Sequence, residues 1–143
     1  MILQKDPRLR KEIQEWGCYL MSIFWFVNKF TNLPVSPDII NGIYDKLLLA
    51  GYINEECEIL NPQAIFEFLK MPVIYHDRHD PPDYKCQRNE FEILEWRYDG
   101  IRHFVAGNGQ GVVTYDPMGC SRTVRYGKLH SKRIFKLLET IGC

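Results

Sequence analysis

The sequence lacks a long hydrophobic run and any excess of charge of one sign. Its most apolar stretch, residues 19–27, is too short to cross a bilayer, which needs about 20 residues. The N-terminus lacks the continuous apolar core of a signal peptide, so cytoplasmic residence is the default expectation. Lysine plus arginine and aspartate plus glutamate both total 18, which leaves no basic field for nucleic acid or anionic lipid. We therefore expect neither a membrane span nor a nucleic-acid partner.

The sequence also lacks paired cysteines. There are five of them, an odd number, and none is in CxxC spacing. A zinc ribbon or a complete disulfide framework needs pairs, so free thiols are the simpler interpretation. The cysteines are Cys18, Cys57, Cys86, Cys120 and Cys143.

A second group of potential metal ligands lies in the middle of the chain. Its members are His76, Asp77, His79, Asp80 and Cys86. Their spacing matches no standard structural zinc pattern, and the adjacent Pro81-Pro82 favours a plain surface loop. We expect no metal and no cofactor.

The length of 143 residues and the 45% hydrophobic content suit one domain that spans residues 1–143. After a charged lead-in, apolar spacing and capping residues predict helices over residues 18–30, 36–51 and 62–69. Apolar runs between turn residues then predict strands, and the chain closes with an amphipathic helix over residues 130–141. The expected strands cover residues 73–77, 91–98, 101–106, 112–116 and 123–126. This order predicts an α+β fold, with N-terminal helices packed on a C-terminal antiparallel sheet.

Cys18 stands where the first buried helix is expected to begin, directly after Gly17. A thiol is a strong nucleophile only as a thiolate, which a helix N-terminus and a nearby imidazole favour. A lone cysteine in an apolar helix is more often a buried structural thiol. The catalytic interpretation therefore depends on partners elsewhere in the chain.

Those partners are expected on the hairpin HFVAGNGQGVVTYDP, which carries His103 and Asp116. If Gly109-Gln110 is a two-residue turn, His103 and Asp116 pair directly across the strands. If Asn108-Gly109 is the turn, His103 faces Thr114, and Asp116 lies two residues along on the same face. With a three- or five-residue loop, Asp116 points to the face opposite His103, unless a β-bulge shifts the alternation of side chains by one residue. In the simpler interpretation, Asp116 only caps its turn and His103 is a structural histidine.

An acyl-transfer site also needs donors for an oxyanion. The backbone N–H of Cys18 is one candidate, and the carboxamide of Gln14, four residues earlier, is the other. Gln14 could equally be a solvated helix residue.

Gln14 followed by a helix-starting Cys18, then GIRHFV, a glycine-rich turn, VVTYDP and Gly119, resembles the papain-like cysteine peptidase superfamily. The likeness is greatest to its compact bacterial branch, which includes the bacteriocin-leader (double-glycine) peptidases. The resemblance implies a papain-like fold without a cofactor. It further implies Cys18 as nucleophile, His103 as general base and acid, Asp116 as the orienting residue and Gln14 as oxyanion donor. The residues after Cys18 are bulky where the family usually has small ones.

The resulting expectation is a thiol-dependent hydrolase, a peptidase or amidase, that acts on a peptide or protein through an acyl-enzyme on Cys18. One alternative is an inactive papain-like pseudoenzyme whose cleft binds a peptide. Another is a small bacterial or phage-type interaction protein in which the hairpin only scaffolds a binding surface. The sequence leaves the substrate and the oligomeric state open.

Overall fold

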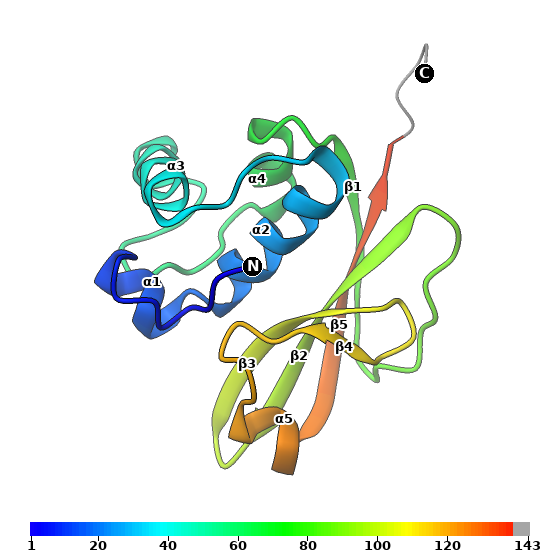
Figure 1. Ribbon diagram of the computed structural model, residues 1–143. Helices are drawn as coiled ribbons and strands as arrows, with labels where there is room; N and C mark the ends of the chain where they lie inside the picture. Colours follow the sequence, from blue (N-terminus) through cyan, green and yellow to red (C-terminus); the bar gives the residue numbers. More distant parts are fainter. Residues whose placement is uncertain (139–143) are drawn as a thin grey trace.

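The computed structural model describes residues 1–138. Its helices gather on one side of a five-stranded antiparallel sheet, with one further short helix at an end of the sheet (Figure 1). The predicted α+β class is thus confirmed. None of the helices within residues 1–138 is long and apolar enough to cross a membrane.

The first two helices, α1 (Lys11–Trp16) and α2 (Cys18–Thr31), are separated by a single residue. That residue is Gly17, where a Cβ atom would collide with the backbone and side chain of Ile13. α2 is the central helix of the core and packs against the sheet (Figure 1). It ends at Asn32, which adopts the left-handed conformation. This geometry makes Cys18 the first residue of a buried helix, as predicted.

The next two helices follow the predicted caps closely. α3 (Pro37–Ala50) begins after Ser36, whose side chain accepts the N–H of Ile39. α4 (Pro62–Phe68) begins after Asn61, which accepts the N–H of Ala64. Both have proline in the first turn, where its missing N–H costs nothing.

The sheet has the strand order β1-β5-β2-β3-β4, so the last strand lies between the first two. The strands are β1 (Val73–His79), β2 (Glu90–Tyr98), β3 (Ile101–Gly107), β4 (Val113–Tyr115) and β5 (Lys128–Leu137). The helix-facing side carries stacked aromatic rings, including Phe91 of β2 and Phe135 of β5 at 5.3 Å between ring centroids. Phe26 of α2 lies 4.5 Å from Phe91, which joins the helical layer to the sheet.

Two predicted elements near the C-terminus were wrong. Residues 123–126 are not a strand but lie in the short helix α5 (Arg122–Tyr126), whose first turn is capped by the Ser121 hydroxyl. The predicted helix over residues 130–141 is part of strand β5 as far as Leu137, while residues 139–141 lie outside the described residues. β5 pairs with β1 on one side and β2 on the other, so tertiary pairing outweighs its helical apolar spacing.

β5 was not predicted as a strand because its sequence contains charged residues. Lys132 and Arg133 are buried, each against a buried glutamate of the neighbouring strand β2. Lys132 meets Glu92 on the face away from the helices, and Arg133 meets Glu95 on the helix-facing side. A central strand thus carries charge on both faces because each charge has a partner.

Candidate active site

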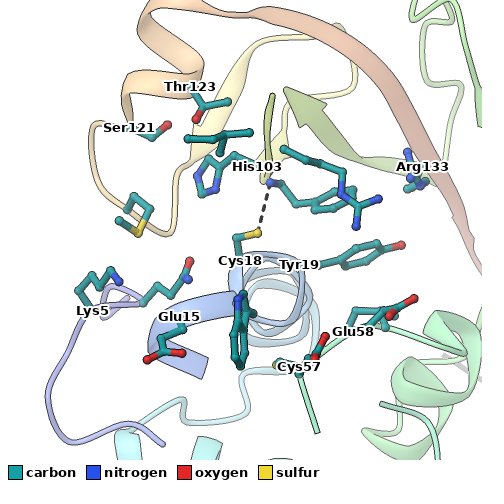
Figure 2. A pocket seen from close by; sticks show the side chains of 18 of the residues that line it. Lys5, Glu15, Cys18, Tyr19, Cys57, Glu58, His103, Ser121, Thr123 and Arg133 are labelled. Carbon is teal, nitrogen blue, oxygen red and sulfur yellow. Dashed lines mark hydrogen bonds between the residues drawn. The ribbon is translucent and has the colours of Figure 1, made fainter. Parts of the chain in front are cut away.

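A cavity of about 910 Å³ opens where the start of α2 meets β3 and the segment after β4. Cys18 and His103 both line it, from the helical and the sheet wall respectively (Figure 2). The third predicted residue, Asp116, lies buried behind His103, 9% exposed. The structure therefore brings together three residues that are 85 and 13 positions apart in sequence (103 − 18 and 116 − 103).

Cys18 is partly exposed and points its sulfur toward the sheet. The Sγ atom accepts a hydrogen bond from the backbone N–H of Phe104 at 3.4 Å, drawn as the dashed line in Figure 2. This contact holds the sulfur against the strand that carries His103. As the first residue of α2, Cys18 also has a backbone N–H without an acceptor inside its own helix.

His103 lies on β3 and is 6% exposed. Its Nε2 atom is 2.7 Å from Oδ1 of Asp116, a hydrogen bond buried from solvent. This contact leaves Nδ1 for the thiol of Cys18, which lies below and to the right of the imidazole in Figure 2. The ring is thus held by a carboxylate on one nitrogen while the other faces a potential nucleophile.

The hairpin places Asp116 on the face of His103 by the third of the predicted routes, in which a bulge compensates for a five-residue loop, here residues 108–112. Ala106 pairs with Tyr115, but the next pair toward the turn is Gly107 with Val113. Thr114 is therefore an extra residue, a β-bulge, and its hydroxyl donates to the carbonyl of Ala106 at 3.1 Å. Because side chains alternate along each strand, the Ala106–Tyr115 pair returns Asp116 to the side of His103.

Asp116 is held by more than His103. Its Oδ1 atom also accepts the N–H of Met118 at 2.9 Å. Its Oδ2 atom accepts the N–H of Ser121 at 3.1 Å and the Ser121 hydroxyl at 2.7 Å. Ser121 is also the cap of α5, so the short helix and the carboxylate fix each other. The expected turn role of Asp116 and its contact with His103 therefore coexist.

The electrostatics of the pair favour an imidazolium. Burial lowers the pKa of His103, but hydrogen bonds with Asp116 and Cys18 and the charges of both outweigh it, and the pKa rises from 6.5 to about 9. Burial raises the pKa of the Asp116 carboxyl, but hydrogen bonds from His103, Ser121 and Met118 hold it well below its usual range. At neutral pH the pair is therefore a carboxylate and an imidazolium, and the imidazolium adjoins the sulfur of Cys18.

The other described cysteines lie in different surroundings. Burial raises the pKa of Cys57 to about 12 and, together with nearby Glu92 and Glu90, that of Cys86 to about 12. Cys120 is exposed and also lines the cavity. Cys143 lies outside the described residues. Among the described cysteines, only Cys18 contacts a histidine.

The two candidate oxyanion donors have different positions. Cys18 lines the cavity, but the Gln14 carboxamide donates to the Leu9 carbonyl at 2.8 Å, and Gln14 does not line the cavity. Gln4, which sequence reasoning missed, does line the cavity and is 3% exposed. Its backbone N–H donates to the carbonyl of Pro117, which ties the N-terminal segment beside the Asp116 loop. No local sequence signal identifies Gln4, because a long-range contact places it there.

Of the three bulky residues after Cys18, two belong to the core. Leu20 and Met21 are fully buried and do not line the cavity. Only Tyr19 reaches the cavity, where its ring lies 4.6 Å from that of Phe104. The helix thus contributes one large side chain to the cavity wall.

The second cluster of potential ligands is dispersed among other partners. His76 lies 3.0 Å from a carboxylate oxygen of Glu90, and His79 stacks on Tyr84. Asp80 lies 3.4 Å from a ring nitrogen of His130. Within residues 1–138, no group of three histidine, cysteine or acidic side chains is arranged to hold a metal ion.

Comparison with known proteins yields a family but no activity. A family model described as "Protein of unknown function, DUF261" matches residues 1–137. No curated protein and no solved structure matches the chain.

Proposed function

Because the chain belongs to the DUF261 family of proteins of unknown function, we propose its activity from the geometry of the cavity. We propose that it is a thiol hydrolase of papain-like type, a peptidase or amidase that forms an acyl-enzyme on Cys18. One observation carries the proposal: Cys18, His103 and Asp116 converge, with the sulfur and the imidazole exposed to one cavity and the carboxylate behind. The motif resemblance and the order of helices and antiparallel strands support it.

The chemistry follows from these positions. The Cys18 thiolate attacks the carbonyl carbon of a substrate amide, and the carbonyl oxygen becomes an oxyanion. His103 gives its Nδ1 proton to the departing amine as the C–N bond breaks, which leaves a thioester on Cys18 and a neutral imidazole. The imidazole then takes a proton from water, whose hydroxide attacks the thioester. Collapse of that intermediate releases the carboxylic acid and restores the thiolate and imidazolium. Asp116 keeps the ring oriented in both steps.

The oxyanion needs donors on the cavity side of the sulfur. The Cys18 N–H, at the first position of α2, is one. Gln4 provides the second donor in our proposal, in place of Gln14, because Gln4 is the glutamine that lines the cavity. The Gln4 Oε1 atom is buried without a partner and Nε2 donates to the Gln14 carbonyl at 3.1 Å. A modest rotation of the amide is then required to direct an N–H group to the oxyanion.

The decisive test is the acyl-enzyme itself. Incubation with 4-nitrophenyl acetate should release 4-nitrophenol in a burst and add one acetyl group to Cys18, detected by peptide mass spectrometry. Cys120→Ala is the matched control, since Cys120 is an exposed thiol in the same cavity without a histidine partner. The burst should survive Cys120→Ala and vanish in Cys18→Ala. Acetylation of all accessible thiols at similar rates would refute the proposal.

A second candidate is a papain-like pseudoenzyme that binds a peptide. The observation in its favour is Tyr19, the bulky residue next to Cys18, whose ring packs on Phe104 in the wall of the cavity. In that case Cys18 should react with iodoacetamide no faster than Cys120. A fast, selective reaction of Cys18 near neutral pH favours the enzyme.

A further inference from the structure

Two guanidinium groups lie close to the ring that adjoins the sulfur. The Cζ atom of Arg133 lies 5.2 Å from the ring centroid of Phe104, and that of Arg102 lies 5.5 Å from it. Phe104 follows His103 in β3, and its backbone N–H is the donor to Cys18 Sγ. All three side chains line the cavity. A region of positive charge therefore lies next to the reactive atoms, on the sheet wall.

This positive charge is not neutralised by the protein. Arg133 binds the buried carboxylate of Glu95 at 2.9 Å, but the same carboxylate also binds Arg97 at 2.6 Å. The single negative charge of Glu95 is thus shared by two arginines. Arg102 has no ion-pair partner within residues 1–138. The Phe104 subsite, which we define as Arg102, Arg133, Phe104 and Tyr19, therefore carries a net positive charge.

The surroundings of the subsite strengthen its interaction with an anion. Tyr19 and Phe104 form its apolar walls, and the side chain of Arg133 is only 10% exposed. Charge-assisted hydrogen bonds are stronger where water is excluded. An arginine fork also matches the two oxygens of a carboxylate better than a point charge does.

The opposite wall of the cavity has the opposite sign. Glu56 and Glu58 line it from the loop between α3 and α4, and Figure 2 shows Glu58 across from Tyr19. Like charges repel, so an acidic group that enters the cavity is directed from the loop wall toward the sheet wall. The sheet wall that adjoins Cys18 is thus a side of the cavity where a carboxylate is favoured.

We propose that the Phe104 subsite binds an acidic side chain of the substrate, close to the bond that Cys18 cleaves. This inference rests on the proposed thiol hydrolase activity and names its substrate class: peptides with glutamate or aspartate near the scissile bond. The carboxylate lies between Arg102 and Arg133, and its carbon stem packs on Tyr19.

The probes for the test are acetyl-tripeptide chloromethyl ketones, which alkylate an activated thiol after binding as substrates do. Three sets of alanine-based probes carry glutamate, its uncharged isostere glutamine, or lysine at the first, second or third position from the ketone. In one of the three sets, the glutamate probe should label Cys18 about 10-fold faster than the glutamine probe. A factor of about 10 corresponds to the lower end of the free energy expected for a hydrogen bond to a charged group. The lysine probe of that set should be slower still.

Variants of the subsite identify the source of this preference. Arg102→Gln should reduce the ratio of glutamate to glutamine labelling, and Arg102→Glu should reverse the preference toward lysine. Arg133 is tested as the double variant E95Q/R133Q, because removal of both partners leaves no unpaired buried charge. Arg125→Gln is the matched control, since Arg125 lies over Tyr126 and does not line the cavity. It should keep the wild-type ratio.

The outcomes separate the two proposals. If no probe labels Cys18 faster than Cys120, the thiol hydrolase proposal fails, and this inference fails with it. If Cys18 is labelled rapidly but no position prefers glutamate, or one prefers lysine, only the acidic subsite is refuted. A glutamate preference that survives both Arg102→Gln and the double variant also refutes it.

Discussion

Two buried acid–base pairs lie on the same sheet, yet only one of them has the features of an active site. His103 and Asp116 meet at 2.7 Å beside the cavity, and Lys132 and Glu92 meet at 3.1 Å on the face away from the helices. All four side chains are at least nine-tenths buried. Burial and charge pairing alone therefore do not distinguish them.

The partners of each pair make the difference. Glu92 Oε2 accepts the N–H groups of Gly109 and Gly111, while Lys132 also donates to the carbonyl of Tyr84 at 2.7 Å. These contacts lie within the protein and hold the glycine-rich turn. In the other pair, one imidazole nitrogen remains for a thiol that lines a cavity. The Lys132–Glu92 pair is thus closed on itself, whereas the His103–Asp116 pair leaves one ring nitrogen facing the cavity.

The largest expected contrast lies between the two thiols next to these pairs. Cys86 lies 3.9 Å from Glu92, and its pKa is raised to about 12, whereas Cys18 contacts an imidazolium. At pH 7, iodoacetamide should alkylate Cys18 at least about 1,000-fold faster than Cys86, because the thiolate is the nucleophile. A mass-spectrometric time course measures both rates in one sample. Comparable rates would remove the distinction between the pairs.

The next effect concerns stability. Glu92→Gln leaves Lys132 buried without its charge partner, so the free energy of unfolding should fall by about 3–5 kcal/mol. Asp116→Asn should cost less, because His103 can lose its proton. Urea unfolding of both variants checks the order. A larger loss for Asp116→Asn would mean that the site is the main structural pair.

For reactivity the order reverses. Asp116→Asn removes the charge that favours the imidazolium, so acylation of Cys18 by 4-nitrophenyl acetate should slow by about 100-fold. Glu92→Gln, assayed where it is folded, should slow acylation far less. Stopped-flow absorbance of 4-nitrophenol provides the rates. Equal losses in both variants would contradict the separation of roles.

The pH dependence of stability should report the site pair. The folded pKa of His103, about 9, is above its ordinary 6.5, so its stabilising contribution is complete below pH 6.5 and is lost as the pH rises through 9. Over that interval the unfolding free energy should fall by an amount on the order of 2 kcal/mol. The fall should be smaller in Asp116→Asn, measured by urea unfolding at each pH. An unchanged pH profile in that variant would contradict the assignment.

The smallest expected effect distinguishes the two glutamines. Gln4→Ala should slow acylation by about 10-fold. This loss of rate is smaller than is usual for one oxyanion donor, because the ester is activated and the Cys18 N–H remains as a donor. Gln14→Ala should instead cost stability, about 1 kcal/mol, through the lost bond to Leu9. The burst rate and urea unfolding of each variant measure these effects. A slower burst in Gln14→Ala alone would restore the original expectation.

The sequence predicted the elements that have local signals. The helix caps Ser36 and Asn61 and the break at Gly17 are short-range features, and the structure confirms the helices that they delimit. β5 was missed because its buried charges Lys132 and Arg133 find partners only on a strand about 40 residues earlier. Such partners are invisible to a local pattern. α5 was missed because the cap at Ser121 was not recognised.

The site follows the same rule. The order of Cys18, His103 and Asp116 and their types were enough to predict their proximity, and the structure confirms that they meet. The sequence left three hairpin pairings open and could not choose between them, since the observed one depends on an extra residue at Thr114. Gln4 was missed because its position depends on the contact of the N-terminal segment with Pro117.

The bulge at Thr114 has a consequence for how this hairpin can change during evolution. It lies between the glycine-rich turn and Asp116. The number of residues in the turn can therefore change without a change in the orientation of the Asp116 carboxylate. A one-residue insertion or deletion among residues 108–112 can be absorbed by forming or removing a bulge, and His103 keeps its partner. The same change between residues 116 and 121 would displace Ser121 from the carboxylate. Length variation among relatives is therefore expected in the turn and not in the segment that follows Asp116.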